Sequence, residues 1–164
     1  MRTETISVLQ FDELKSEIQE KVIEKYREDL DYPFLSDNLD EELNELLQKH
    51  KIKGEATIYY ALSYNQGSGC CFIGSFKWRN YNITIQHRSN LDYHKRTVGI
   101  YIETRFGNEA KESINQEFEQ IYSKICDRLE KSGYNYIEAE QESENIAENI
   151  RINEYEFLSD GTRW

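Results

Sequence analysis

Three histidines and one aspartate are the residues whose types could perform metal or hydrolytic chemistry. His87, Asp92 and His94 surround one predicted loop, and His50 could join them in the folded chain. Imidazole and carboxylate groups are ligands of Zn²⁺, and metal-bound water is the usual nucleophile of metal-dependent hydrolases. The spacing of these residues matches no motif for a metal or a catalytic site. A small metal-dependent nuclease or hydrolase, with Gln66 as a further site residue, is therefore an alternative hypothesis.

A glycine-containing loop and three cysteines are the other candidates for chemistry. The segment 66–69 lacks the lysine and the glycine spacing of a phosphate-binding loop and precedes a predicted strand, so we interpret it as a hairpin turn. Cys70 and Cys71 are adjacent, which directs their side chains to opposite faces of a strand and prevents a shared metal. Together with Cys126 they make an odd count that favours buried, reduced thiols. We expect no enzyme, no cofactor and no metal.

Carboxylates are concentrated in two runs, and their spacing predicts a surface for a basic partner. From residue 29 to 45 every charged side chain is an acid, and from 138 to 160 only Arg151 interrupts the acids. Carboxylates four residues apart on a helix recur about every 6 Å along one face, a row that could occupy a basic groove made for nucleic acid. Acidic helices also serve solubility alone. The predicted partner-binding residues are Asp37, Asp40, Glu41, Glu45, Glu140, Glu144 and Glu148, with Tyr32, Phe34 and Tyr155 as apolar anchors.

The composition limits the class of protein. With 164 residues, 38% apolar and 13% aromatic, the chain is long enough and aromatic enough to close a core, and we expect one domain over 1–164. Its net charge of −11 argues against general binding to nucleic acid or anionic membranes, although residues 77–105 carry an excess of bases. No stretch resembles a signal peptide or a membrane span, so we expect a cytoplasmic protein.

Periodicity predicts the elements that position these residues. A strand over 3–8 precedes two helices, one from 12 or 16 to 29 and one over 36–50, and Pro33 separates them. Alternation predicts strands over 55–64, 70–78, 81–88 and 97–106, joined as an antiparallel meander. Helices are expected from Asn108 to Gly133 and over 140–151, followed by an edge strand over 155–158. The order βααββββαα(β) predicts an α+β fold, an antiparallel four-to-five-stranded sheet with helices packed on one face.

Three segments resemble an uncharacterised family of small phage and prophage proteins. They are Phe11-Asp-Glu-Leu14 with the Lys-Tyr-Arg-Glu that ends at Glu28, the stretch Leu62-Ser-Tyr-Asn-Gln-Gly-Ser-Gly-Cys-Cys-Phe72, and Asn153-Glu-Tyr-Glu-Phe157 with the following Asp-Gly. The second segment is similar to the family's Ser-Gln-Gly-Asp-Gly-Ala-x-Phe, but Ser68 stands where the family has Asp. The resemblance implies a mobile-element origin and a bacterial cytoplasm, and some members carry the label antitoxin.

These observations lead to one leading hypothesis for function. We expect an acidic, phage-type binding protein that inhibits a host nucleic-acid-processing defence enzyme, in the manner of an anti-CRISPR protein, by occupying its basic groove. The expected partner is a basic host protein such as a nuclease or a defence complex, with no direct contact to nucleic acid or membrane. An antitoxin-like protein that neutralises a partner toxin is the alternative within the class of binding proteins.

Overall fold

The computed structural model describes residues 6–88 and 93–164 of the chain. These residues form two compact units. The terminal unit combines the residues up to Pro33 with Tyr136–Trp164, and the sheet unit consists of the described residues of Phe34–Asn135. The expectation of one domain over 1–164 stays a prediction.

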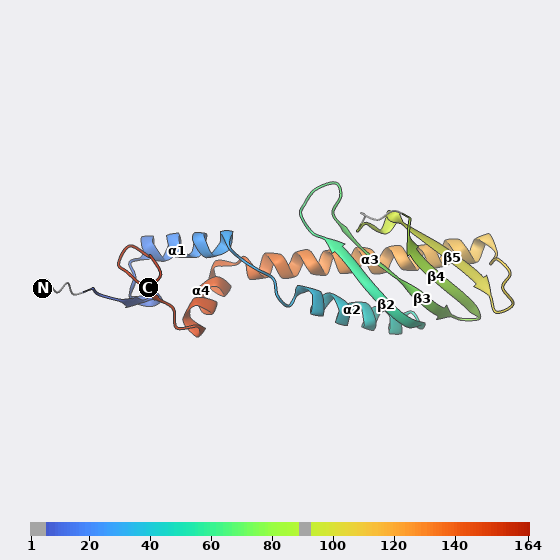
Figure 1. Cartoon of the computed structure of the whole chain (residues 1–164), viewed down its shortest axis with the longest axis horizontal. Coiled ribbons are helices and arrows are strands. Elements are labelled where there is room, and N and C mark those ends of the chain that lie inside the picture. Colours follow the sequence, from blue (N-terminus) through green and yellow to red (C-terminus); the bar gives the residue numbers. More distant parts are fainter. Residues whose placement is uncertain (1–5, 89–92) are drawn as a thin grey trace, which may run out of the picture. The chain divides into compact units, whose positions relative to one another are not determined.

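The α+β class and the order of elements are confirmed (Figure 1). The helices are α1 (Ser16–Glu28), α2 (Leu35–Lys49), α3 (Glu112–Glu140) and α4 (Ser143–Ile152). The strands are β1 (Leu9–Gln10), β2 (Ile52–Ala61), β3 (Gly69–Trp78), β4 (Tyr81–His87), β5 (Val98–Thr104) and β6 (Glu156–Phe157). Short 3₁₀ turns cover Phe11–Glu13 and Lys95–Thr97.

The sheet unit is an antiparallel meander of four strands in the order β2-β3-β4-β5. One face of this sheet is apolar and packs on α3, where the Phe72 ring lies 4.6 Å from Tyr122 and the Trp78 ring lies 5.3 Å from Phe118. Helix α2 packs beside β2. It lies on the same side of the sheet as α3, as the ion pair between Glu42 of α2 and Arg128 of α3 shows. Most side chains of the other face are exposed, such as Lys53, Thr57 and Lys77, although Cys71 is buried; the prediction of helices on one face is confirmed for α2 and α3.

The sequence predicted that the helix from Asn108 ends at Gly133. Instead, α3 continues to Glu140. A Cβ atom at Gly133 would lie 2.4 Å from Cδ1 of Leu62, which follows β2. The glycine therefore serves the close approach of this chain segment to the helix, and it is not a helix stop. Sequence alone does not distinguish the two uses of a glycine in a helical pattern.

The terminal strands differ from the expected ones. The strand predicted over 3–8 begins outside the described residues, and residues 6–8 are not in a strand. Instead β1 pairs with β6 antiparallel, Leu9 opposite Phe157, in a sheet of its own. The segment expected as an edge strand of the large sheet thus completes the terminal unit. Because β1 and β6 are two residues long, their packing and not their pattern decides their pairing.

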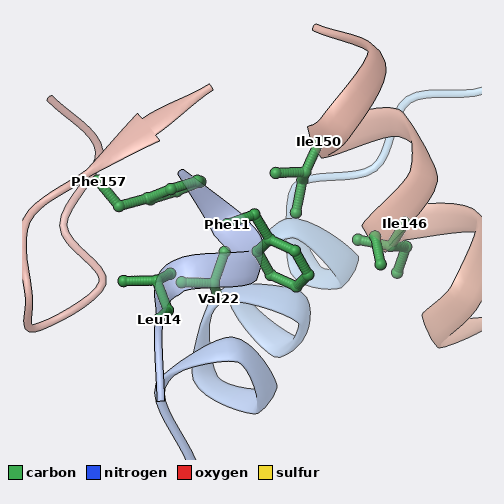
Figure 2. Packing of buried hydrophobic residues seen from close by; sticks show 7 residues of the cluster. Phe11, Leu14, Val22, Ile146, Ile150 and Phe157 are labelled. Carbon is green, nitrogen blue, oxygen red and sulfur yellow. The ribbon is translucent and has the colours of Figure 1, made fainter. Parts of the chain in front are cut away.

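The core of the terminal unit is a cluster of buried apolar side chains from both ends of the sequence (Figure 2). Phe11 begins the short 3₁₀ turn and Leu14 directly follows it, whereas Val22 comes from α1 and Ile150 from α4. The ring of Phe157 completes the cluster, with its centroid 6.4 Å from that of Phe11 in an edge-to-face arrangement. This burial holds the segments before α1 and after α4 together, although more than a hundred residues of sequence separate them.

Candidate functional site

The acidic row on α2 is formed as the sequence predicted. Leucines at every fourth position of α2 are buried against the sheet unit, and Asp37, Glu41 and Glu45 lie about half a turn away from them, exposed to solvent. Among the residues that the structure describes, these three carboxylates have no cationic partner within ion-pair distance. The row is therefore a negative surface that the protein itself leaves uncompensated.

Two further acids of α2 lie beside the row. Asp40 is half-buried, and burial raises the pKa of its carboxyl, an effect to which the negative charge of Asp37 adds. Glu42 is compensated, because the Arg128 Nε lies 2.8 Å from its Oε1. At the C-terminal end of the row, Glu45 borders a groove of about 750 Å³ that is mixed in charge, lined by Glu42, Glu45, Leu46, Lys49, His50, Lys124, Ile125 and Arg128. The acidic row therefore meets a surface of mixed charge at Glu45, its C-terminal member.

The second predicted row does not form. Glu140 is the last residue of α3, while Glu144 and Glu148 belong to α4, which begins at Ser143. The helix expected over 140–151 is present as α4 but begins three residues later, so the four-residue spacing from Glu140 to Glu144 does not place them on one helical face. In addition, Glu144 lies 3.2 Å from Arg151, which also pairs with Asp12. Of the acids predicted here, Glu148 alone is an exposed helical carboxylate without a cationic partner among the described residues.

The three predicted aromatic anchors have different environments. Phe34 immediately precedes α2 and is 64% exposed, which suits an apolar contact beside the acidic row. Tyr32 belongs to the terminal unit, where its hydroxyl accepts a hydrogen bond of 2.8 Å from the Gln141 side chain. Tyr155 is also in the terminal unit. Its ring stacks on that of Tyr26, with the centroids 5.9 Å apart, and the Arg163 guanidinium lies 3.7 Å from its centroid. Phe34 is thus the anchor that its surroundings favour.

The histidines do not converge on a metal site in the described part of the chain. His87 contacts the Tyr59 ring edge-on at 4.7 Å, and His94 accepts a hydrogen bond from the Arg96 backbone N–H at Nδ1. His50 borders the groove between α2 and α3, and Asp92 lies outside the described residues. No group of three or more potential metal ligands occurs within residues 6–88 and 93–164.

Ser68 organises the loop between β2 and β3. Its Oγ accepts hydrogen bonds of 3.1 Å from the backbone N–H groups of Ser63 and Asn65, and it donates one of 3.3 Å to Asn65 Oδ1. Ser68 is 8% exposed, whereas Gln66 projects into solvent. The next residue, Gly69, has no room for a side chain, because a Cβ atom there would lie 2.8 Å from the His94 ring. The loop residues thus have structural reasons for their types, and an Asp at position 68 could accept the same backbone bonds.

We expect Ser68→Ala to lower the free energy of unfolding by about 1–3 kcal/mol, because two backbone N–H groups lose their acceptor in a partly buried loop. Ser68→Asp, which introduces the residue of the resembling family, restores an acceptor and is expected to stay within about 1 kcal/mol of the natural protein. Denaturation in urea measures both values. An alanine variant as stable as the natural protein would contradict the role of the hydroxyl.

All three cysteines are buried free thiols. Burial raises the pKa of Cys70 to about 12 and that of Cys71 to about 11, and it raises the pKa of Cys126 as well. Since the thiolate is the reactive form, these side chains stay protonated and unreactive at neutral pH. Their surroundings fit the predicted role of small apolar residues.

One feature of the sheet unit was not predicted as a site. Arg88, Lys95 and Arg96 line a pocket of about 370 Å³ beside β5 and α3. The only sequence signal for it was the excess of bases within 77–105, which spread over several strands and a loop. The fold brings three of these cations to one concave surface.

The comparisons with known proteins add no relative. No protein-family model matches the chain, and neither a curated protein nor a solved structure shows significant similarity to it. The resemblance to the phage family therefore stays a prediction from the three sequence segments. Within the described residues, no helix combines the length and the apolar character that crossing a membrane requires.

Proposed function

We propose that this protein binds a basic surface of a bacterial host protein through the acidic face of α2, and thereby inhibits a nucleic-acid-processing defence enzyme. The observation that carries this proposal is the row of Asp37, Glu41 and Glu45, which is exposed and has no cationic partner among the described residues. Like charges on one helical face repel one another, so the row does not contribute to the stability of the free protein. A partner that supplies cations removes this repulsion.

The spacing of the row defines what kind of surface fits it. Three carboxylates four residues apart extend over about 12 Å, or one charge per roughly 6 Å. Along the duplex axis, one strand of DNA carries one phosphate per roughly 3.4 Å, which is nearly twice the charge density of the row along its helix. The row therefore engages a few lysines or arginines of a basic groove without copying a nucleic-acid backbone. Phe34 at the start of α2 adds an exposed ring that an apolar pocket beside those cations would bury.

The proposal is tested by a charge reversal of the row. In Asp37→Lys/Glu41→Lys/Glu45→Lys the net charge changes from −11 to −5, because each replacement adds two charges. We expect binding to the host partner to fall at least about a hundredfold, since attraction becomes repulsion at each of three contacts. Tagged protein is used to capture partners from a host lysate at low and at high salt, and the captured protein is then titrated with purified variants.

A matched control separates this surface from net charge. Glu17, Glu20 and Glu28 of α1 are exposed, have no ion pair among the described residues, and give the same change of charge when replaced by Lys. We expect this control to keep its affinity within about threefold. Equal losses in both triple variants would reduce the row to general electrostatics, and full binding by the α2 variant would exclude it. Capture of a small basic toxin encoded nearby, instead of a defence enzyme, would favour the antitoxin function.

A further inference from the structure

A cationic pocket lies on the sheet unit, separate from the acidic face of α2. It has a volume of about 370 Å³, within the range of small-molecule sites. The 3₁₀ turn Lys95–Thr97, strand β5 and helix α3 contribute to it. The lining residues are Arg88, Lys95, Arg96, Val98, Ile100, Glu119, Tyr122 and Ser123.

The cations of this pocket differ in their partners. Lys95 is compensated, since its ammonium group donates to Ser123 Oγ at 2.9 Å and pairs with Asp127. Arg88 and Arg96 have no side-chain partner within the described residues, and neither pairs with Glu119, the only carboxylate in the lining. Two uncompensated guanidinium groups in one pocket are unexpected in a chain with a net charge of −11. An anion that binds in this pocket can be attracted by both groups.

The backbone holds both arginines at the same short turn. The Arg88 N–H donates to the Thr97 carbonyl at 2.8 Å, and the Thr97 N–H donates to the His94 carbonyl at 2.9 Å. The Arg96 N–H donates to His94 Nδ1 at 3.1 Å, and Thr97 Oγ1 donates to the His94 carbonyl at 2.7 Å. These hydrogen bonds fix the backbone of residue 88 relative to that of residue 96, from which the two exposed side chains extend. Such preorganisation lowers the entropic cost of binding a ligand.

The apolar residues of the lining indicate the chemistry of the rest of the ligand. Val98 is buried and Ile100 is half-buried on β5, and Tyr122 of α3 also lines the pocket. Apolar surface beside a pair of guanidinium groups fits a molecule with a phosphate at one end and a compact ring at the other, because guanidinium binds phosphate oxygens in a bidentate manner. Glu119 disfavours further negative charge.

We propose that this pocket binds a phosphomonoester with a planar or apolar body, of the class of a nucleoside monophosphate, with its phosphate between Arg88 and Arg96 and its body against Val98 and Ile100. The ligand can be a free nucleotide or the 5′-phosphate end of a strand, which share this chemistry. The site is independent of the acidic row on α2. It would give an otherwise acidic binding protein a second, small-molecule or strand-end contact.

Calorimetric titration of the full-length protein with AMP, inorganic phosphate and adenosine tests the pocket. We expect AMP to bind more tightly than inorganic phosphate, and adenosine to bind at least about tenfold more weakly than AMP, because it lacks the charge-assisted bonds. A short oligonucleotide with and without a 5′-phosphate separates the two sources of the ligand. Absence of AMP binding at millimolar concentration together with absence of phosphorylated-strand binding would overturn the proposal, as would equal binding of AMP and adenosine.

Variants of equal charge change locate the binding. Arg88→Gln/Arg96→Gln should weaken AMP binding at least about tenfold, whereas Lys53→Gln/Lys77→Gln, on the exposed face of β2 and β3, should change it less than about twofold. Glu119→Gln should tighten binding severalfold, because it removes the one carboxylate in the lining. Thermal unfolding confirms that each variant is folded. Equal weakening by the two double variants, or weaker binding by Glu119→Gln, would refute the assignment to this pocket.

Discussion

Tyr122→Phe is expected to lower the free energy of unfolding by about 2–4 kcal/mol, although it removes a single oxygen atom from the core. Strand β4 pairs with β3 only from Gly74 onward, so the backbone of Phe72 has no strand partner on that side. The Tyr122 hydroxyl takes the place of a strand there, because it accepts from the Phe72 N–H at 3.2 Å and donates to the Phe72 carbonyl at 3.1 Å. Phenylalanine leaves both buried groups without a partner.

The setting of Tyr122 makes this loss large. The side chain is 2% exposed, and burial raises the pKa of its hydroxyl, which is therefore protonated and able to donate at neutral pH. Denaturation in guanidinium chloride measures the effect. Tyr101→Phe is the matched control, since its ring lies exposed on the outer face of β5, and it should change stability by less than about 0.5 kcal/mol. Similar values for the two variants would show that water or relaxation satisfies the Phe72 groups.

Gly74→Ala is the second substitution with a large expected effect, a loss of about 2–4 kcal/mol or failure to fold. Gly74 lies in β3 with φ at +150°, a conformation that is nearly restricted to glycine. An added Cβ would lie 2.3 Å from the Glu55 carbonyl oxygen in β2 and 2.9 Å from the Phe76 ring. Because the nearest atom belongs to the backbone of the neighbouring strand, the clash is not relieved by a rotamer change.

Besides the backbone of β2, the ring of Phe76 occupies space that a side chain at position 74 would need. Gly54 of β2 is extended in the same way, with φ at +153°, and its added Cβ would also meet the Phe76 ring. Two glycines thus make room for one buried aromatic ring across two strands. Gly67→Ala is the control, since its nearest neighbour would be the Asn65 side chain at 3.4 Å, and it should change stability by less than about 1 kcal/mol. Thermal unfolding of both variants measures the difference, and an alanine at 74 that costs as little as one at 67 would contradict the explanation.

Local pattern was sufficient for the features of this protein that depend on neighbours in sequence. Periodicity predicted the helix α2, and the four-residue spacing of Asp37, Glu41 and Glu45 predicted that these acids share one face, because helical geometry relates spacing to direction. Alternation predicted β3 and β4 within one residue at each end, and with β2 and β5 it predicted the meander. These predictions needed no knowledge of what each element packs against.

The errors concern residues whose role depends on a distant contact. Gly133 has the same appearance in the sequence whether it ends a helix or accommodates Leu62, and only the packed structure shows the second use. The sequence predicted a break after Gly133 and a second helix from residue 140, whereas the break lies between Glu140 and Ser143 and separates Glu140 from Glu144. The pairing of β1 with β6 joins segments from the two ends of the chain.

Tertiary structure alone also decided where charge is left uncompensated. The sequence shows acids on α2 and bases between residues 77 and 105, but ion pairing depends on distances between elements. Glu42 and Lys95 have partners on α3, whereas Asp37 and Arg96 have none among the described residues. Coulomb attraction falls with distance and with exposure to water, so the same residue types are compensated in one place and free to bind in another. The acidic row and the cationic pocket follow from that difference.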